Sequence, residues 1–397
     1  MRVPAAPGAP LRVMFCLDSL EAGGTELNAV RTAERLDRER VRVEVVCLRP
    51  EGPLLARCAA AGIAVHPFPI PSLAGAAALR QGMRLARFLR AERVQVFHAH
   101  DMYSNMFGVP WARLAGVPRV VASRRWWRGP ESRAQRWANR GAYLFAHAVL
   151  ANSERVGTLL SARERVRAAR IAIVPNFVDE TAFRHPGAAR LRSWRHELAL
   201  DDDARVVGIV ANLSPFKDHP TLLRAIARLL PRWPALRLVV AGGGDARPLH
   251  VLARALGVGH AVRFAGARPP VPAMHPLFEV SVLSSVSEGL PNSLLEAMAA
   301  ARPVVATAVG ATADAVEHGV TGLLVPPSDP DRLAEAIGAL LADPARGRAM
   351  GQAGRDRARA RYSAGAALAA LERLYAPPAR SGGGFRARSP LLAGGPG

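Results

Sequence analysis

The stretch Val206–His219, which reads VVGIVANLSPFKDH, decides the fold of this 397-residue chain. It begins as an apolar run, passes through a short polar turn with a proline, and enters a sequence suited to a helix. A buried strand followed by a turn and a helix is the repeating unit of parallel α/β sheets. The turn contains Lys217, the only lysine among 53 lysines and arginines. Because ligands bind at the carboxyl ends of strands in such sheets, Lys217 is a candidate functional residue.

The same alternation of short apolar runs and amphipathic stretches continues in both directions. Candidate strands of the first half are Leu11–Leu17, Val41–Leu48, Ile63–Phe68, Val94–Phe97, Arg119–Ala122, Ala148–Ala151 and Ile171–Val174. Those of the second half are Arg205–Val210, Arg237–Ala241, Ala261–Phe264, Glu279–Leu283, Pro303–Ala306 and Gly322–Val325, followed by helices at Asp331–Leu341 and Ala345–Ala360. We therefore expect an α/β protein with two Rossmann-like domains facing each other across a cleft. The domains cover residues 1–178 and 179–376, and 377–397 form a flexible tail.

Composition limits the class of protein and its compartment. Half of the residues are hydrophobic, which excludes a disordered protein. No stretch approaches the roughly 18 apolar residues that span a bilayer. The three cysteines are an odd number, and the first ten residues lack the apolar core of a signal peptide. We therefore expect a cytoplasmic protein with reduced thiols.

The net charge of +21 is concentrated in residues 80–170, which hold 18 arginines and 5 acidic residues. Within this region, Arg124–Arg140 contains six arginines and three tryptophans. Arg80, Arg84 and Arg87 fall on one face of a predicted helix. Trp beside Arg is typical of segments that lie on an anionic membrane surface. The alternatives are a solvated helix face with buried tryptophans, and a nucleic-acid-binding surface, although no nucleic-acid-binding motif is present.

The densest group of polar residues is Ser284–Met298, SSVSEGLPNSLLEAM. A predicted strand ends at its start, a glycine and a proline follow, and the remainder predicts a helix. The free N–H groups at the start of a helix favour an anion. Glu288 precedes this helix and Glu296 lies in its early turns, so both would accept hydrogen bonds from hydroxyls beside that anion. Alternatively, Glu296 only stabilises the helix dipole and Glu288 is a solvated loop residue.

Glu288 and Glu296 form a Glu-x7-Glu element that resembles the one in the retaining nucleotide-sugar glycosyltransferases of family 4 (glycosyl transferases group 1), which have the GT-B fold. Further stretches are similar to the donor domain of that family, in the same order: Ala241–Gly244, Val262–Gly266, Glu296–Ala299, Pro303–Thr307 and Thr321–Val325. Pro175–Asp179 resembles the segment between its domains. The resemblance implies an acceptor domain over residues 1–178 and a nucleotide-sugar donor domain over 179–376.

The resemblance implies a metal-independent transfer of a sugar, with retention of the anomeric configuration, from a nucleoside-diphosphate sugar to a glycan acceptor. That acceptor would be lipid-linked or a polysaccharide, as in lipopolysaccharide or exopolysaccharide biosynthesis. It implies no cofactor and no metal site. The sequence itself offers no strong metal motif either, since Asp201–Asp203 is expected to be a solvated acidic turn and no group of cysteines and histidines has zinc spacing. The protein would then be cytoplasmic, or peripheral on the inner face of the cytoplasmic membrane, and would not bind nucleic acid.

Roles for single residues follow from the same resemblance. Lys217 would contact the donor diphosphate, since a compact ammonium fits against a phosphate oxygen and stabilises charge on a leaving nucleotide. Glu288 would contact hydroxyls of the transferred sugar, and Glu296 those of the ribose; Lys217 and Glu288 are the catalytic candidates. The other positions expected to contact the donor are Asn212, Arg263, Phe264, Gly266, Gly289, Leu290, Gly23 and Gly24, of which the last two could instead face the acceptor.

Two positions depart from the family pattern. The family often has an arginine five residues before its lysine, where this chain has Asn212. It also often places a histidine after the fifth strand, where this chain has Arg124 and Arg125. Either arginine would replace that histidine or supply phosphate charge, or a histidine after the fourth strand, His98 or His100, would align with it instead. The two histidines would otherwise be ordinary residues that orient a loop.

Other enzyme classes share this type of fold. An NAD-dependent enzyme would need Gly242–Gly244 as its fingerprint, but Arg247 stands in the place of the third glycine. A nucleotide-sugar epimerase or a phosphorylase is a further alternative within the fold. The Glu-x7-Glu element favours sugar transfer over both.

Overall fold

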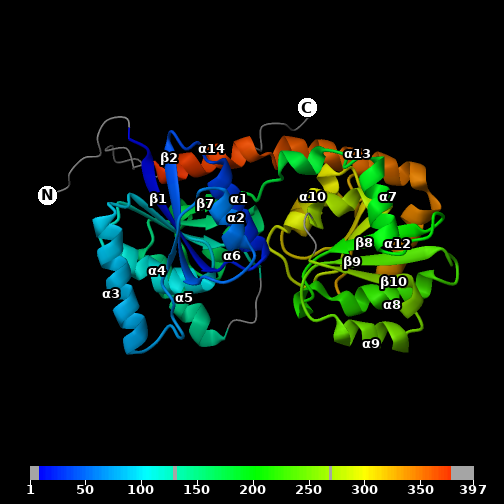
Figure 1. Cartoon of the computed structure of the whole chain (residues 1–397), viewed down its shortest axis with the longest axis horizontal. Helices are drawn as coiled ribbons and strands as arrows, with labels where there is room; N and C mark the ends of the chain where they lie inside the picture. Colours follow the sequence, from blue (N-terminus) through cyan, green and yellow to red (C-terminus); the bar gives the residue numbers. More distant parts are fainter. Residues whose placement is uncertain (1–8, 128–131, 268–270, 377–397) are drawn as a thin grey trace. The chain divides into compact units, whose positions relative to one another are not determined.

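The computed structural model describes residues 9–127, 132–267 and 271–376. These residues form two compact units (Figure 1). The first unit contains the described residues up to Pro175 and those from Ala367 on, and the second contains Asn176–Ala366. Each unit is a parallel sheet with helices, so the predicted α/β architecture with two sheets is confirmed. Arg128 and the predicted tail at 377–397 lie outside the described residues.

The sheet of the first unit has the strand order β3-β2-β1-β4-β5-β6-β7. Its strands are β1 (Leu11–Ser19), β2 (Val41–Arg49), β3 (Val65–Pro67), β4 (Val96–Ala99), β5 (Arg119–Arg124), β6 (Ala148–Ala151) and β7 (Ile171–Ile173). Its helices are α1 (Gly24–Arg35), α2 (Leu54–Ala60), α3 (Ala76–Ala91), α4 (Met102–Leu114), α5 (Arg133–Phe145), α6 (Glu154–Ala162), the 3-10 turn η1 (Ala168–Arg170) and most of α14 (Ala364–Tyr375). The central strands are buried on both faces, as their continuous apolar runs predict.

The sheet of the second unit has the order β10-β9-β8-β11-β12-β13. Its strands are β8 (Arg205–Val210), β9 (Leu236–Ala241), β10 (Val262–Gly266), β11 (Val280–Leu283), β12 (Val304–Thr307) and β13 (Leu323–Val325). Its helices are α7 (Ala188–Glu197), α8 (His219–Leu229), α9 (Arg247–Ala255), α10 (Asn292–Ala299), α11 (Thr312–Ala315), α12 (Pro330–Ala342) and α13 (Pro344–Arg361). Short 3-10 turns complete it: η2 (Glu180–Phe183), η3 (Pro215–Lys217), η4 (Gly259–Ala261) and η5 (Val271–Leu277).

Two glycines allow neighbouring segments of the second unit to pack closely against each other. A Cβ at Gly208, in β8, would lie 2.4 Å from the ring of Phe278, so glycine leaves room for this buried side chain. Gly242 has a φ of 158°, and a Cβ there would lie 2.0 Å from the carbonyl oxygen of Ala211. The glycine-rich stretch after β9 can therefore lie against the segment that leaves β8, which brings both loops to the carboxyl edge of the sheet.

The last helix, α14, does not follow the domain boundaries expected from the sequence. The sequence predicts a second domain that runs to residue 376, whereas the end of α14 belongs to the first unit. Tyr375 is 1% exposed. Arg119 Nε donates to the carbonyl of Leu374 at 2.8 Å, and Arg40 pairs with Glu372 at 2.7 Å. Burial of the phenol ring in the core of the first unit stabilises this placement.

Candidate active site

The loops that follow β8 and β11 meet at the carboxyl edge of the second sheet, because these strands are neighbours. The N–H of Val286 donates to the carbonyl of Phe216 at 2.9 Å. Ser284 Oγ donates to the carbonyl of Lys217 at 2.7 Å. These two bonds join the loop that carries Lys217 to the loop that carries Glu288.

Lys217 and Glu288, the two catalytic candidates, are in direct contact. Lys217 Nζ lies 2.5 Å from Glu288 Oε1, and the two side chains are 23% and 10% exposed. Ser285 Oγ donates to the same carboxylate oxygen at 2.6 Å. The structure thus brings both candidates together in a half-buried ion pair, which the sequence did not predict. A pair that both remains partly accessible and is oriented by a hydroxyl can exchange its partners for those of a ligand.

The turn around Lys217 is held in a defined geometry. Asp218 has a φ of 45°, a left-handed conformation that a non-glycine residue adopts only at a local cost. Its carboxylate accepts hydrogen bonds from the backbone N–H and the hydroxyl of Thr221, at 3.3 and 2.8 Å, and so caps α8. Burial, followed by the charge of Lys217, lowers the pKa of His219 to about 4. His219 therefore adds no positive charge beside the lysine at neutral pH.

Helix α10 begins directly beside this ion pair. Pro291 is its N-cap. The N–H groups of the first turn have no acceptor within the helix, and they give this end an attraction for anions. Glu296 lies in the second turn and is 4% exposed. Glu288 and Glu296 therefore lie before and within α10, as the motif predicts.

The segment between Glu288 and α10 is fixed by backbone contacts. The carbonyl of Gly289 accepts from the N–H of Ala311 at 3.0 Å. The carbonyl of Leu290 accepts from Asn176 Nδ2 at 2.7 Å. The side chain of Leu290 is buried, and the carbonyls of Gly289 and Leu290 both already accept hydrogen bonds. A contact of these two residues with a donor would therefore use backbone N–H groups.

Asn212 and Gly266 lie at the same edge. Asn212 Oδ1 accepts from the N–H of Gly243 at 3.2 Å. The carbonyl of Gly266 accepts from the N–H of Gly242 at 3.0 Å. The amide at position 212 thus orients the glycine-rich stretch after β9. That is a structural role which the arginine common in the family could not fill in the same way, because a guanidinium has no acceptor.

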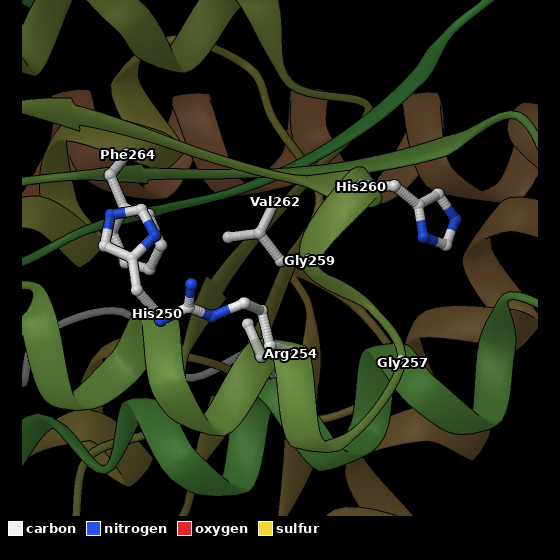
Figure 2. Close-up of a pocket in the computed structure, with 8 residues that line it drawn as sticks. His250, Arg254, Gly257, Gly259, His260, Val262 and Phe264 are labelled. Atoms are coloured by element: carbon white, nitrogen blue, oxygen red, sulfur yellow. The ribbon is translucent and has the colours of Figure 1, made fainter.

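Arg263 and Phe264 lie away from the ion pair. Arg263 donates to the carbonyls of Leu198 at 3.0 Å and His260 at 2.7 Å, so its guanidinium joins backbone segments. The ring of Phe264 lies 4.3 Å from that of His250, at one end of a cavity of about 540 Å³ (Figure 2). The cavity is lined by His250, Ala253, Arg254, Gly257, Gly259, His260, Val262 and Phe264. It lies between α9 and the start of the edge strand β10, and neither Lys217 nor Glu288 lines it.

In the first unit, His98 and His100 lie at the carboxyl end of β4. His98 Nδ1 lies 2.6 Å from the hydroxyl of Tyr375, and its Nε2 lies 2.8 Å from Ser123 Oγ. The rings of His98 and His100 are 4.0 Å apart, and Phe15 packs against both. Burial lowers the pKa of both histidines well below the usual range, so both are neutral at pH 7.

Arg124 is the last residue of β5 and Arg125 follows it, and the two side chains have different partners. Arg124 pairs with Glu164 at 2.6 Å, and its guanidinium lies 4.6 Å from the ring centroid of Trp126. Arg125 donates to Asn28 Oδ1 at 2.8 Å. Burial lowers the pKa of Arg125 to about 10. Arg124 is thus engaged in an ion pair within the unit, and Arg125 lies under α1.

Gly23 is the N-cap of α1 and Gly24 is its first residue, and the carboxylate of Glu26 lies against Gly23. A Cβ at Gly23 would lie 2.1 Å from Glu26 Oε2, so the carboxylate folds back against the loop. The N–H of Asp18 donates to Asp101 Oδ2 at 2.9 Å. Burial, together with the charges of Asp101 and Asp18, raises the pKa of Glu26 to about 7. Arg49 pairs with Asp18 and offsets one of these charges. The negative charge that remains opposes binding of a diphosphate and favours hydroxyl groups.

These three carboxylates form an acidic group that the sequence reasoning missed. Asp18 and Asp101 stand at the carboxyl ends of β1 and β4, which are neighbours in the sheet. Burial raises the pKa of Asp101 to about 6, and the charge of Asp18 contributes. The signal was present in the sequence, because parallel neighbouring strands bring the residues at their ends together.

The basic region lies on α3 and α5, both of which pack against α4 (Figure 1). Helix α3 exposes Leu79 and Met83 beside three arginines, Arg80, Arg84 and Arg87. Helix α5 exposes Trp137 (64%) and Leu144 (76%) beside Arg133 and Arg136. The other two tryptophans serve the fold, since Trp126 lies under Arg124 and Trp127 packs against the core. Among the described residues, no helix is long and apolar enough to cross a bilayer.

Comparison with known proteins identifies the family. The model of Glycosyltransferase Family 4 matches residues 22–182, and that of Glycosyl transferases group 1 matches residues 192–357. A D-inositol 3-phosphate glycosyltransferase of Corynebacterium jeikeium is 32% identical over 90% of this chain and 93% of its own. A GDP-mannose-dependent alpha-(1-6)-phosphatidylinositol monomannoside mannosyltransferase of Mycobacterium tuberculosis is 33% identical over 65% of this chain and 71% of its own.

Solved structures agree on the fold. Anabaena HepE, solved in complex with UDP and glucose, has a TM-score of 0.82 at 21% identity and covers 91% of this chain and 98% of its own. Sucrose-phosphate synthase from Thermosynechococcus elongatus has a TM-score of 0.78 at 22% identity, with 92% and 98% covered. The family matches favour sugar transfer over the NAD-dependent, epimerase, phosphorylase and nucleic-acid-binding alternatives. The chain therefore belongs to glycosyltransferase family 4 and is a glycosyltransferase with the GT-B fold.

Proposed function

We propose that the protein transfers a sugar from a nucleoside-diphosphate sugar that binds at the carboxyl edge of the second sheet. The observation that supports this most strongly is the contact of Lys217 with Glu288, beside the start of α10. On donor binding, Lys217 would exchange its carboxylate partner for a diphosphate oxygen, and Glu288 would accept from sugar hydroxyls. Glu296 would accept from the ribose. An ammonium held beside the leaving phosphate stabilises the charge that develops there.

We further propose that the anomeric configuration is retained and that no metal is needed. In the preferred mechanism, the acceptor hydroxyl attacks the anomeric carbon on the face from which the diphosphate departs. The new C–O bond forms as the bond to phosphate breaks, and the hydroxyl proton passes to the departing phosphate oxygen. Lys217 and the start of α10 would balance the diphosphate charge. Activity that survives an excess of EDTA would support this, and activity restored only by a divalent cation would overturn it.

For the acceptor we propose a molecule rich in hydroxyl groups. The support is the acidic group of Asp18, Glu26 and Asp101 beside Gly23 and Gly24, because carboxylates accept hydrogen bonds from a polyol. The relatives named above act on inositol 3-phosphate or on a phosphatidylinositol mannoside, which are both polyols that carry a phosphate. We therefore favour an inositol-type acceptor over the lipopolysaccharide or exopolysaccharide glycans implied by the family resemblance alone.

A donor and acceptor panel tests these assignments. UDP-glucose, UDP-N-acetylglucosamine and GDP-mannose would each be incubated with D-inositol 3-phosphate, with phosphatidylinositol vesicles or with no acceptor. We expect one donor to raise the melting temperature and to yield a glycosylated acceptor, since ligands stabilise the folded state. Proton NMR of the product then reports the anomeric configuration. A new nucleotide sugar formed without acceptor would indicate an epimerase, and the absence of any nucleotide-dependent shift would contradict the donor assignment.

We also propose that the first unit binds an anionic membrane surface from the cytoplasmic side. The support is the exposure of Trp137 and Leu144 on α5, and of Leu79 and Met83 on α3, among arginines. The three buried, unpaired cysteines are consistent with a reducing compartment. A lipid-borne acceptor would then be reached by a protein already held at the surface.

A further inference from the structure

His100 is an unusually placed polar side chain. It has no exposed surface, and neither of its ring nitrogens has a hydrogen-bond partner among the residues that the structure describes. Burial, then the charges of His98 and Arg125, lowers the pKa of His100, so the ring is neutral. A neutral imidazole has one donor and one acceptor, and each one left unpaired inside a protein costs free energy on folding. Such a cost is typical of a residue whose partner arrives with a ligand.

His98 is arranged in the opposite way. Both of its ring nitrogens have partners, the hydroxyl of Tyr375 at 2.6 Å and that of Ser123 at 2.8 Å. A ring held at both nitrogens cannot rotate without losing two buried hydrogen bonds. Because its centroid lies 4.0 Å from that of His100, the fixed ring of His98 sets one wall of the space that His100 occupies. His98 is therefore suited to position His100 rather than to bind a ligand itself.

Tyr375 supplies the outer end of this arrangement. Phe15 packs against His98, His100 and Tyr375, with ring centroids 5.6, 4.5 and 6.5 Å away, so the four rings form one cluster. The helix end that carries Tyr375 is itself held, through the hydrogen bond of Arg119 to the carbonyl of Leu374. A residue near the end of the described chain thus determines the orientation of a histidine 277 positions earlier.

We propose that His100 hydrogen-bonds a hydroxyl group of the acceptor, and that Tyr375 is a positioning residue that acts on it through His98. His100 directly precedes Asp101, a member of the acidic group that suits polyol hydroxyls, so both would contact the same ligand. One ring nitrogen would donate to an acceptor oxygen and the other would accept from a hydroxyl. Because the ring is fully buried, the acceptor must displace neighbouring side chains to reach it. The inference rests on the proposed function, which supplies the acceptor.

NMR of the imidazole nitrogens tests the binding role without altering the protein. In protein labelled with ¹⁵N-histidine, the signals that vanish in His100→Gln identify His100. We expect saturating D-inositol 3-phosphate, added with UDP or GDP, to shift the His100 nitrogens and to leave the His98 nitrogens in place. Unchanged His100 signals at an acceptor concentration that supports turnover would overturn the inference while the proposed function stands. Absence of turnover in the whole donor and acceptor panel would instead contradict the proposed function.

Kinetics of variants test the positioning role. Tyr375→Phe should raise the acceptor KM about tenfold and leave the donor KM unchanged, and His100→Gln, which keeps one donor and one acceptor, should retain more activity than His100→Ala. The control is Tyr143→Phe, which also removes a buried phenol hydroxyl of the first unit, one that accepts from Asn139. It should lower the melting temperature to a similar extent without changing the acceptor KM. Equal increases in the acceptor KM and the donor KM for Tyr375→Phe would refute the assignment. An acceptor KM equal to that of the wild-type protein in both His100 variants would also refute it.

Discussion

The carboxyl edges of the two sheets are built alike but carry different chemistry. In the second unit, an ammonium and the start of a helix meet at the edge, with Glu288 as the partner of Lys217. In the first unit, the corresponding edge carries Asp18, Glu26 and Asp101. The parallel topology determines where a ligand binds in both cases. In the function proposed above, the side chains at that edge determine which ligand binds there, a phosphate in the second unit and hydroxyl groups in the first.

Removal of the ammonium from the second unit should have the largest effect. Lys217→Ala should lower kcat by about 10²–10³, because one preorganised electrostatic contact in a transition state contributes about 2.7–4 kcal/mol. Lys217→Arg should recover only part of this, since a planar guanidinium does not fit the place of a point charge. Steady-state kinetics with saturating donor would measure both. Turnover close to that of the wild-type protein would show that the two edges do not differ in the way described.

The carboxylate inside α10 should matter next, and for binding rather than for turnover. Glu296→Ala should raise the donor KM by about tenfold or more, because hydrogen bonds to a charged group contribute about 1.5–3 kcal/mol. The matched control is Glu335→Ala, which removes an exposed carboxylate of α12 in the same unit. It should leave the donor KM unchanged. An unaltered donor KM in Glu296→Ala would contradict the ribose contact.

The acidic group of the first unit should affect stability through pH. Glu26 has a folded-state pKa raised to about 7 by burial and by Asp101 and Asp18, while Arg49 opposes the shift. A raised carboxyl pKa means that the folded state binds the proton more tightly than the unfolded state. Its contribution to the free energy of unfolding is therefore largest near pH 4 and is lost as pH rises through about 7.

Glu26→Gln should remove this loss. We expect its melting temperature to exceed that of the wild-type protein by a few degrees at pH 8 and by less at pH 5, measured by thermal unfolding in matched buffers. The control Glu21→Gln, in the exposed part of the same loop, should follow the wild-type pH profile. A Glu26→Gln profile parallel to that of the wild-type protein at every pH would show that Glu26 does not titrate in this range.

Much of the fold could be predicted because the decisive signals are local. Apolar runs bounded by polar turns give the strands, since strands of a parallel sheet are buried on both faces. The predicted strand ends agree with the structure to within about two residues, the usual uncertainty of such boundaries. Lys217, Glu288 and Glu296 could be found for the same reason, because each stands in or just after a loop that follows a strand.

The remainder depends on contacts between distant segments, which periodicity does not encode. The ion pair between Lys217 and Glu288 requires β8 and β11 to be neighbours in the sheet, although two other strands, β9 and β10, lie between them in the sequence. Arg263 was expected to contact the donor, and nothing in the sequence indicated that its guanidinium also donates to a backbone carbonyl 65 residues away, at Leu198. The contact between His98 and Tyr375 joins segments that lie 277 positions apart in the sequence. Such pairings become visible only once the sheet order is known.

The smallest effect concerns the surface of the first unit rather than its edge. The double variant Trp137→Ala with Leu144→Ala should weaken binding to vesicles that contain anionic lipid about threefold to tenfold, because partial burial of such side chains contributes on the order of 1 kcal/mol. Flotation would measure it, with neutral vesicles as the comparison. The control is Val320→Ala in the second unit, where an apolar side chain is 49% exposed and the nearest arginines in the sequence are Arg302 and Arg332. If the wild-type protein bound neither kind of vesicle, the exposed face of α5 would be a solvated surface. A lipid-borne acceptor would then have to reach the acidic group without any contact between α5 and the membrane.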